Sequence, residues 1–182
     1  MLPIYLYGNP VLRKKANEVS AEDPHLHKLI DELFETMNQA EGVGLAAPQI
    51  GYSLSVFVID TKGLKESYPE VELIKETFIN PEVIEILGDD FNFNEGCLSL
   101  PEIREDVVRK SEIILSYTNR EGERKTTHFK GLAARVILHE LDHLEGHVFT
   151  DRISSIRKMI VKKKLNDIAS GKTKPKYKSK NS

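Results

Sequence analysis

The chain has 182 residues, and its 26 Lys or Arg against 28 Asp or Glu give a formal net charge of −2. Its 40% hydrophobic and 30% charged residues are typical of one globular domain, or two small ones, with a sizeable core. This near-neutral balance excludes a protein that is basic over its whole surface, such as one that coats nucleic acid, and we expect no DNA partner.

Cysteine content and hydrophobic patterning indicate the compartment. The single cysteine, Cys97, excludes an intramolecular disulfide, which fits a reducing environment. The first residues lack a basic stretch followed by an apolar segment, so we expect no signal peptide. The apolar stretches fall short of the ~20 residues that span a bilayer. We therefore expect a cytoplasmic protein without a membrane partner.

The first predicted element is an amphipathic helix over residues 26–37, where apolar residues recur every three or four positions. The middle of the chain reads as strands, because short β-branched and aromatic runs occupy residues 55–59, 82–87 and 112–117. Turn signals separate the strands at residues 88–90 and 119–122. Strands that follow one another through short turns favour antiparallel pairing.

Two further helices are predicted in the C-terminal third. One covers residues 131–144, and the other covers residues 154–169 with an apolar side made of Ile156, Met159, Ile160 and Ile168. Residues 171–182 are rich in lysine without a hydrophobic pattern and are predicted to be a disordered basic tail. The predicted fold class is therefore α+β, with a single domain over residues 1–170 followed by the tail.

A possible metal site lies in the second predicted helix, where His139-Glu140-Leu141-Asp142-His143 forms an HExxH motif. Residues four apart on a helix share one face, so both imidazoles can reach one ion. Glu140 can face the same pocket, hold a metal-bound water and carry its proton. The alternative is a helix whose two histidines are ordinary surface or core residues.

Such a site needs a third protein ligand. The HExxHxxGxxH pattern fails because Phe149 stands where the third histidine belongs, and Glu145, the last glutamate, is too close to His143. Upstream, Cys97 follows Gly96, which allows a close backbone approach, and a thiolate is a strong ligand for zinc or ferrous iron. The alternative for a lone cysteine is a small buried hydrophobe.

A third segment reads Gly42-Val43-Gly44-Leu45-Ala46-Ala47-Pro48-Gln49. Its two glycines before small residues permit tight packing against a ligand or against the metal-binding helix. It is no phosphate loop, because it lacks the lysine of that motif. Gln49 offers an uncharged amide donor suited to an oxyanion, and the alternative is a surface glutamine after a turn.

Together and in this order, the three segments resemble the motifs GxGLAAxQ, EGCLS and HExxH of the peptide deformylases, over about residues 2–166. The resemblance implies antiparallel β-sheets surrounding a central HExxH helix, with an N-terminal helix and a C-terminal helix. It also implies a metal-dependent hydrolase that removes the N-formyl group from the initiator methionine of nascent polypeptides and releases formate.

The resemblance assigns a role to each matching position. The ligands of one divalent metal, with water as the fourth, would be Cys97, His139 and His143. Ferrous iron is the usual metal of such enzymes, and zinc or nickel can substitute. Glu140 would be the general acid/base. Gln49 and the backbone N–H of Leu98 would stabilise the oxyanion.

Substrate binding is expected along the backbone of Val43 and Gly44 and at Gly96, where an extended peptide would pair as a strand does. The methionine side chain needs an apolar pocket, which we expect Ile137 to line in part. Arg104 corresponds to an arginine that many family members carry near the substrate exit. The alternative for Arg104 is a solvated loop charge.

The third predicted helix and the tail are basic. Some deformylases use their C-terminal helix to dock on the ribosome near the exit tunnel, and lysines facing RNA phosphates would make that contact salt-sensitive. The alternative is a solubilising tail. Three rival functions also remain open: a different metallohydrolase using the same site, a deformylase-like binding protein without catalysis, and a metal-free structural domain.

Overall fold

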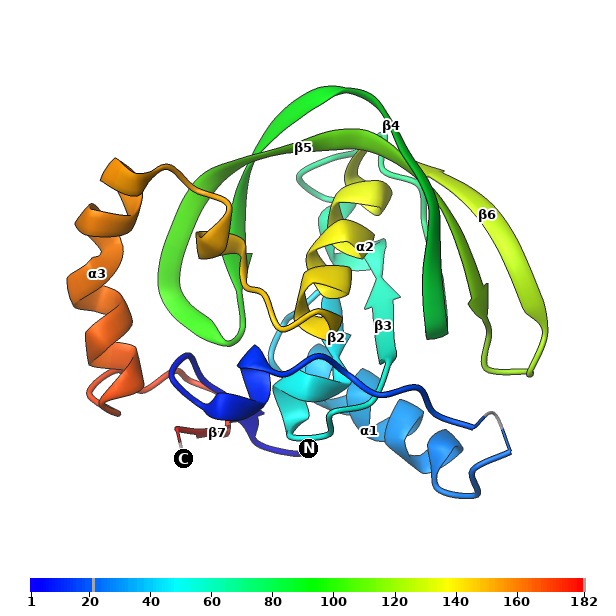
Figure 1. The fold of residues 1–182 in the computed structure, drawn as a ribbon, viewed down its shortest axis with the longest axis horizontal. Coiled ribbons are helices and arrows are strands. Elements are labelled where there is room, and N and C mark those ends of the chain that lie inside the picture. Colours follow the sequence, from blue (N-terminus) through cyan, green and yellow to red (C-terminus); the bar gives the residue numbers. More distant parts are fainter. Residues whose placement is uncertain (21, 182) are drawn as a thin grey trace.

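The computed structural model describes residues 1–20 and 22–181, and its centre is the helix α2 (Gly131–Leu144). A five-stranded antiparallel sheet of order β2-β3-β4-β5-β6 curves around this helix (Figure 1). The strands are β2 (Gly44–Ala46), β3 (Val56–Asp60), β4 (Lys75–Cys97), β5 (Leu100–Thr118) and β6 (Arg124–Lys130).

Two outer helices complete the fold, α1 (Leu26–Gln39) near one end of the sheet and α3 (Ser155–Ala169) on the opposite side (Figure 1). Short 3₁₀ turns cover Pro10–Arg13, Ala47–Ile50, Thr61–Leu64 and Phe149–Asp151. This arrangement confirms the predicted α+β fold with an antiparallel sheet, and the HExxH motif lies in α2. Among the described residues, no helix is both long and apolar enough to cross a membrane.

One predicted turn, at residues 88–90, is wrong, because these residues belong to the long β4–β5 hairpin. Residues 88–90 lie inside β4, where the pairing register shifts between Leu87 and Asp90 and Gly88 adopts a φ of +80°. A glycine in this conformation lets a strand take up extra residues as a bulge while the ladder continues. The chain instead reverses at residues 98–99, within the EGCLS motif. The predicted turn at residues 119–122 is confirmed as the link between β5 and β6.

Helix α3 follows its predicted range but buries a different side. Of the predicted apolar side, Ile156, Met159 and Ile160 are 67%, 68% and 59% exposed, and only Ile168 is buried. The buried residues are Val161, Leu165 and Ile168, which join a core cluster with residues of the β4–β5 hairpin. The helix lies at the edge of the molecule, so only one narrow stripe of it meets the core (Figure 1).

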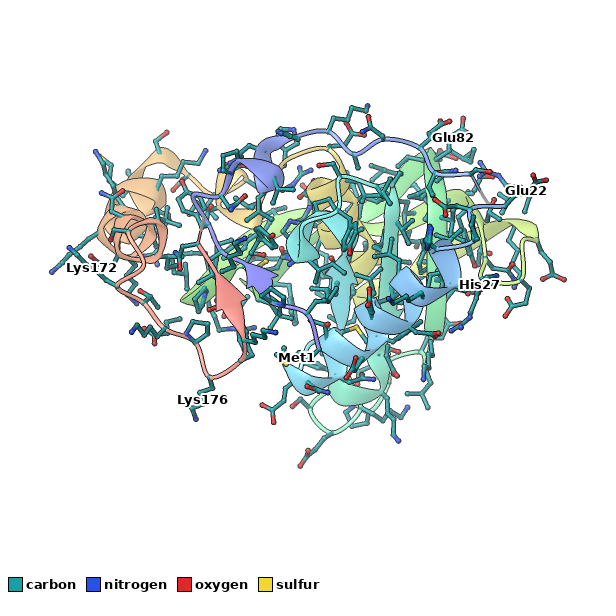
Figure 2. The ribbon with its side chains drawn as sticks, turned by 90° about the horizontal axis from the view of Figure 1, so that it is seen from below. Met1, Glu22, His27, Glu82, Lys172 and Lys176 are labelled. Atoms are coloured by element: carbon teal, nitrogen blue, oxygen red, sulfur yellow. The ribbon has the colours of Figure 1, made fainter. Side chains whose placement is uncertain are left out.

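The C-terminal segment is also more ordered than predicted. The prediction of a disordered tail over residues 171–182 is wrong for residues 171–181, because Ser179–Lys180 forms β7 and pairs in parallel with β1 (Ile4–Tyr5). Its last residue, 182, lies outside the described residues. Backbone hydrogen bonds join Ile4 N–H to the Lys178 carbonyl and Leu6 N–H to the Lys180 carbonyl, each at 2.9 Å. Main-chain pairing needs no hydrophobic pattern, so the sequence carried no signal for it. Figure 2 shows β7 beside β1, with Lys176 projecting away from the body.

Candidate active site

The structure brings together the three residues predicted as metal ligands. One donor atom each from Cys97, His139 and His143 lies within 4.8 Å of the others. The two histidines come from successive turns of α2, and the cysteine comes from the last residue of β4. The Sγ atom of Cys97 is 3.2 Å from Nε2 of His143. One thiolate and two imidazoles are a ligand set that suits zinc or ferrous iron.

Glu95 contacts one of these histidines. Its Oε2 atom lies 2.9 Å from Nδ1 of His139, which leaves Nε2 of the ring facing the cluster. Although burial opposes it, interaction with Cys97 and Glu95 raises the pKa of His139 well above its ordinary value. Burial lowers the pKa of His143. Cys97 and Glu95 thus favour positive charge at His139, which fits a cation site, and both imidazoles bind a metal in their neutral form.

Glu140 stands beside this cluster in a dry position. Its side chain is 3% exposed, and its Oε2 atom has no hydrogen-bond partner among the described residues. Burial raises its pKa to about 7. A nearby dication would favour the carboxylate and lower that pKa again. An unpartnered buried carboxylate oxygen facing a cleft is suited to hold a polar ligand and exchange a proton with it.

The predicted oxyanion donors lie next to Cys97. The Oε1 atom of Gln49 accepts from the Ala46 N–H at 2.8 Å, so the Nε2 amide faces the EGCLS turn. Nε2 donates to Oγ of Ser99 at 3.2 Å and is 3.5 Å from Sγ of Cys97. The N–H of Leu98 has no acceptor within the described part of the chain. Two N–H donors, from Gln49 and Leu98, therefore lie next to Cys97.

A cleft of about 710 Å³ leads to these groups, and all four predicted substrate-binding residues line it: Val43, Gly44, Gly96 and Arg104. The expectation for Ile137 is wrong, because its side chain is fully buried in the core under the sheet. The apolar lining from α2 comes instead from Leu132 and Val136. Residues 174–177 of the C-terminal segment also line the cleft, which the sequence did not indicate.

A buried ionic network supports the site from behind and was missed at the sequence level. Arg109 donates to Glu95 and to Asp142, each at 2.7 Å, and Arg135 donates to Glu95 at 2.9 Å. Against the effect of burial, His139 and Arg109 lower the pKa of Glu95, and Arg152 and Arg109 lower the pKa of Asp142. Glu95 lies in the EGCLS motif and Asp142 in the HExxH motif. Their closeness in sequence to Cys97 and His143 was the only sign that they belong to the site.

The chain is similar to known proteins over nearly its whole length. A family model described as polypeptide deformylase matches residues 1–159. The chain belongs to the peptide deformylase family. It is 45% identical over 185 residues to a peptide deformylase of Christiangramia forsetii, covering 98% of this chain and 94% of that one.

Solved peptide deformylase structures share the fold. A crystal structure from Legionella pneumophila has a TM-score of 0.82 at 35% identity, covering 94% of this chain and 97% of that one. One from Thermotoga maritima has a TM-score of 0.76 at 42% identity, covering 85% and 98%. Peptide deformylases are metal-dependent hydrolases that remove the formyl group from nascent polypeptides, so this chain is an enzyme of that kind.

Proposed function

We propose that this peptide deformylase carries out its reaction in the cleft beside α2, with roles for individual residues as follows. The observation that carries the proposal is the unpartnered, buried Oε2 of Glu140 next to the cluster of Cys97, His139 and His143. A candidate acid/base and a candidate set of metal ligands therefore lie at one cleft, which is large enough for the end of a peptide.

Cys97, His139 and His143 would hold one divalent metal, which we propose to be ferrous iron in the cell, with zinc or nickel able to replace it. When bound, the metal supplies Lewis acidity, which lowers the pKa of water and polarises the formyl carbonyl. A thiolate ligand suits this soft to borderline ion and exposes the site to oxidation. We propose that Glu95 orients His139 through the 2.9 Å contact to Nδ1.

Glu140 is the proposed proton carrier. Its carboxylate takes a proton from the attacking water as the water oxygen bonds to the formyl carbon. When the carbon–nitrogen bond breaks, Glu140 returns the proton to the departing amine, and formate leaves. The amide of Gln49 and the N–H of Leu98 donate to the formyl oxygen while it gains negative charge. Their position beside Cys97 supports this role.

The peptide following the formylmethionine is proposed to lie extended between two backbone segments of the cleft, Val43 and Gly44 on one side and Gly96 on the other. The methionine side chain would pack against Leu132 and Val136. Arg104 donates to the side chain and the backbone carbonyl of Asn94 at 3.0 and 2.7 Å, which keeps its guanidinium at the rim.

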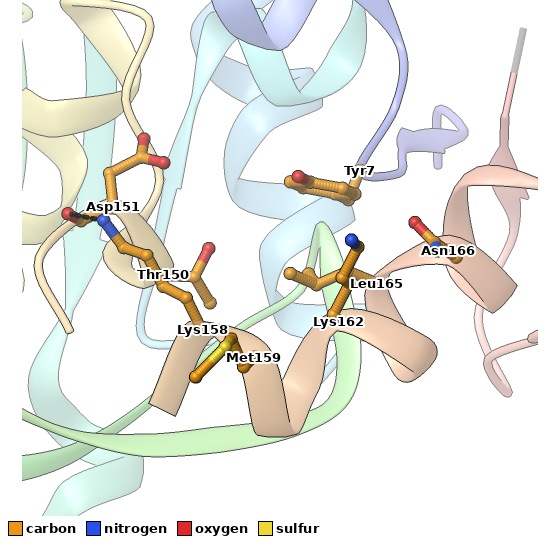
Figure 3. Close-up of a pocket in the computed structure, with 8 residues that line it drawn as sticks. All are labelled: Tyr7, Thr150, Asp151, Lys158, Met159, Lys162, Leu165 and Asn166. Atoms are coloured by element: carbon orange, nitrogen blue, oxygen red, sulfur yellow. Dashed lines mark hydrogen bonds between the residues drawn. The ribbon is translucent and has the colours of Figure 1, made fainter. Parts of the chain in front are cut away.

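We also propose that the enzyme acts in the cytoplasm and docks on the ribosome near the exit tunnel. The support is the outer side of α3, where exposed Ile156, Met159 and Ile160 stand among lysines. A cavity of about 340 Å³ beside them is lined by Met159, Lys158 and Lys162 (Figure 3). Replacing Lys162, Lys163 and Lys164 by glutamate should abolish salt-sensitive ribosome binding and leave formate release from a short peptide unchanged. Full retention of ribosome binding would refute the docking.

The test of the catalytic proposal is formate release from an N-formylmethionyl peptide, with protein purified without oxygen and loaded with ferrous iron. Glu140→Ala should lower kcat by about 10²- to 10⁴-fold with the metal still bound. The matched control is Glu145→Ala, which removes an exposed glutamate at the end of the same helix and should leave kcat unchanged. An active Glu140→Ala enzyme would refute the acid/base role.

A further inference from the structure

The C-terminal strap, residues 174–177, lines the active-site cleft and is tied down at both ends. Before it, Lys172 N–H donates to the Asp167 carbonyl at 2.9 Å, where α3 ends. After it, β7 pairs with β1, and the Asn9 amide donates to the Asn181 carbonyl at 3.1 Å. A segment held on both sides by backbone hydrogen bonds has a defined path across the cleft wall. The strap is thus a part of the site contributed by the far end of the chain.

One strap residue reaches the catalytic turn. The hydroxyl of Tyr177 donates to the carbonyl oxygen of Leu98 at 2.5 Å. The ring of Tyr177 packs against the same core cluster as Leu2 and Leu98. On the next residue, the Ser99 carbonyl accepts from the N–H of Tyr7 at 2.8 Å. The two carbonyls after Cys97 are therefore both held by groups from the ends of the chain.

These bonds matter because of where the turn lies. Residues 98–99 fall between the end of β4 and the start of β5, so they lie outside the strand pairing that orients the residues around them. The N–H and the carbonyl of one residue are joined through two rotatable backbone bonds. Because β4 holds the chain up to Cys97 on the other side, holding the Leu98 carbonyl restricts the rotation about both bonds and so limits the directions in which the Leu98 N–H can point.

We propose that Tyr177 is a positioning residue of this deformylase, which holds the Leu98 carbonyl so that the Leu98 N–H points at the oxyanion. The inference rests on the proposed function of Leu98 as an oxyanion donor. A donor that is held in place before reaction stabilises developing charge without a cost of reorganisation, whereas a mobile donor loses part of that benefit. The bond acts mainly in the transition state, so it should affect kcat more than KM.

Tyr177→Phe tests this, because it keeps the packed ring and removes only the hydroxyl. With iron-loaded enzyme and a formylmethionyl dipeptide, kcat should fall about three- to tenfold, the range of one net hydrogen bond, while KM stays the same. The matched control is Tyr52→Phe, at a tyrosine that is 45% exposed, and it should behave as the original enzyme does. An unchanged kcat, or a change confined to KM, would overturn the proposal.

A second measurement does not depend on turnover. In zinc-loaded protein labelled for NMR, Tyr177→Phe should shift the carbonyl carbon resonance of Leu98 and lower the backbone order parameter of its amide. An order parameter equal to that of the original protein would show that the hydroxyl does not restrain the turn and would refute the positioning role. Failure of the proposed oxyanion role of Leu98 is distinguishable, because Tyr177→Phe would then lower the order parameter of the Leu98 amide while kcat stayed the same.

Discussion

Gly44 lies so close to Glu140 that a β-carbon at residue 44 would overlap the carboxylate of the glutamate. The backbone of β2 therefore packs directly on the proposed acid/base and limits its rotamers. The absence of a side chain at residue 44 is thus a requirement of the site itself.

Gly44→Ala should displace the Glu140 carboxylate and lower kcat/KM about 100-fold, because small displacements of a catalytic group are costly. Metal content should stay the same, since the three atoms nearest to the added β-carbon all belong to Glu140. Gly63→Ala is the control, because a β-carbon there would lie 3.5 Å from a Val43 methyl group, an ordinary contact. Formate release and metal analysis of both variants check the prediction, which fails if Gly44→Ala retains full activity.

Glu95→Gln should weaken metal binding by about 10- to 100-fold, because it removes the carboxylate that orients His139. Competition between the protein and a chromophoric chelator for zinc measures this affinity. Glu102→Gln serves as the control, since Glu102 is an exposed acid on the same hairpin. Equal zinc affinity in Glu95→Gln and the original protein would contradict the orienting role.

The free energy of unfolding should fall on acidification below about pH 4.5, the ordinary pKa range of carboxyl groups. Despite burial, His139 and Arg109 lower the pKa of Glu95. Likewise, Arg152 and Arg109 lower the pKa of Asp142. Groups with depressed folded-state pKa values stabilise the fold above their unfolded pKa, and this stability is lost as the pH falls through the folded pKa.

Each unit of pKa depression corresponds to about 1.4 kcal/mol of that stability. Urea unfolding of the metal-free protein between pH 7 and pH 3 measures the free energy of unfolding without a contribution from metal release. Asp142→Asn removes one of the two groups, so its free energy of unfolding should be lower at pH 7 and depend less steeply on pH. An identical pH dependence in the variant would contradict the assignment.

Removal of the metal should abolish activity and lower the melting temperature, because a ligand that binds only the folded state stabilises it. At a free metal concentration 1,000-fold above Kd the stabilisation is about 4 kcal/mol. Thermal melts before and after chelation, and again after adding ferrous iron or zinc, check this. Cys97→Ala lacks one proposed ligand, so chelation should change its melting temperature much less. A large shift in that variant would argue against the cysteine as a ligand.

The sequence alone determined the chemistry-bearing parts of the molecule and the class of the fold. Helices α1 and α2, the antiparallel strands and the turn at residues 119–122 follow from local periodicity and turn residues, which act over a few positions. The HExxH spacing places His139 and His143 on one helix face whatever surrounds them. Cys97, Gln49 and Glu140 were predicted through their motifs, and the structure gathers them in one cleft with Gly44.

Tertiary structure alone decided what depends on packing between distant segments. Sequence periodicity does not tell which side of α3 meets the core, and Ile156, Met159 and Ile160 face outward because the helix sits at an edge. Gly88 carries a turn signal, yet pairing with β5 makes it a bulge. The strap is ordered by the hydrogen bond of Tyr177 to Leu98 and by the pairing of β7, which follows it, with β1, and these partners are far away in the chain. Such long-range bonds leave no local pattern, because each one depends on where the rest of the fold has already put its partner.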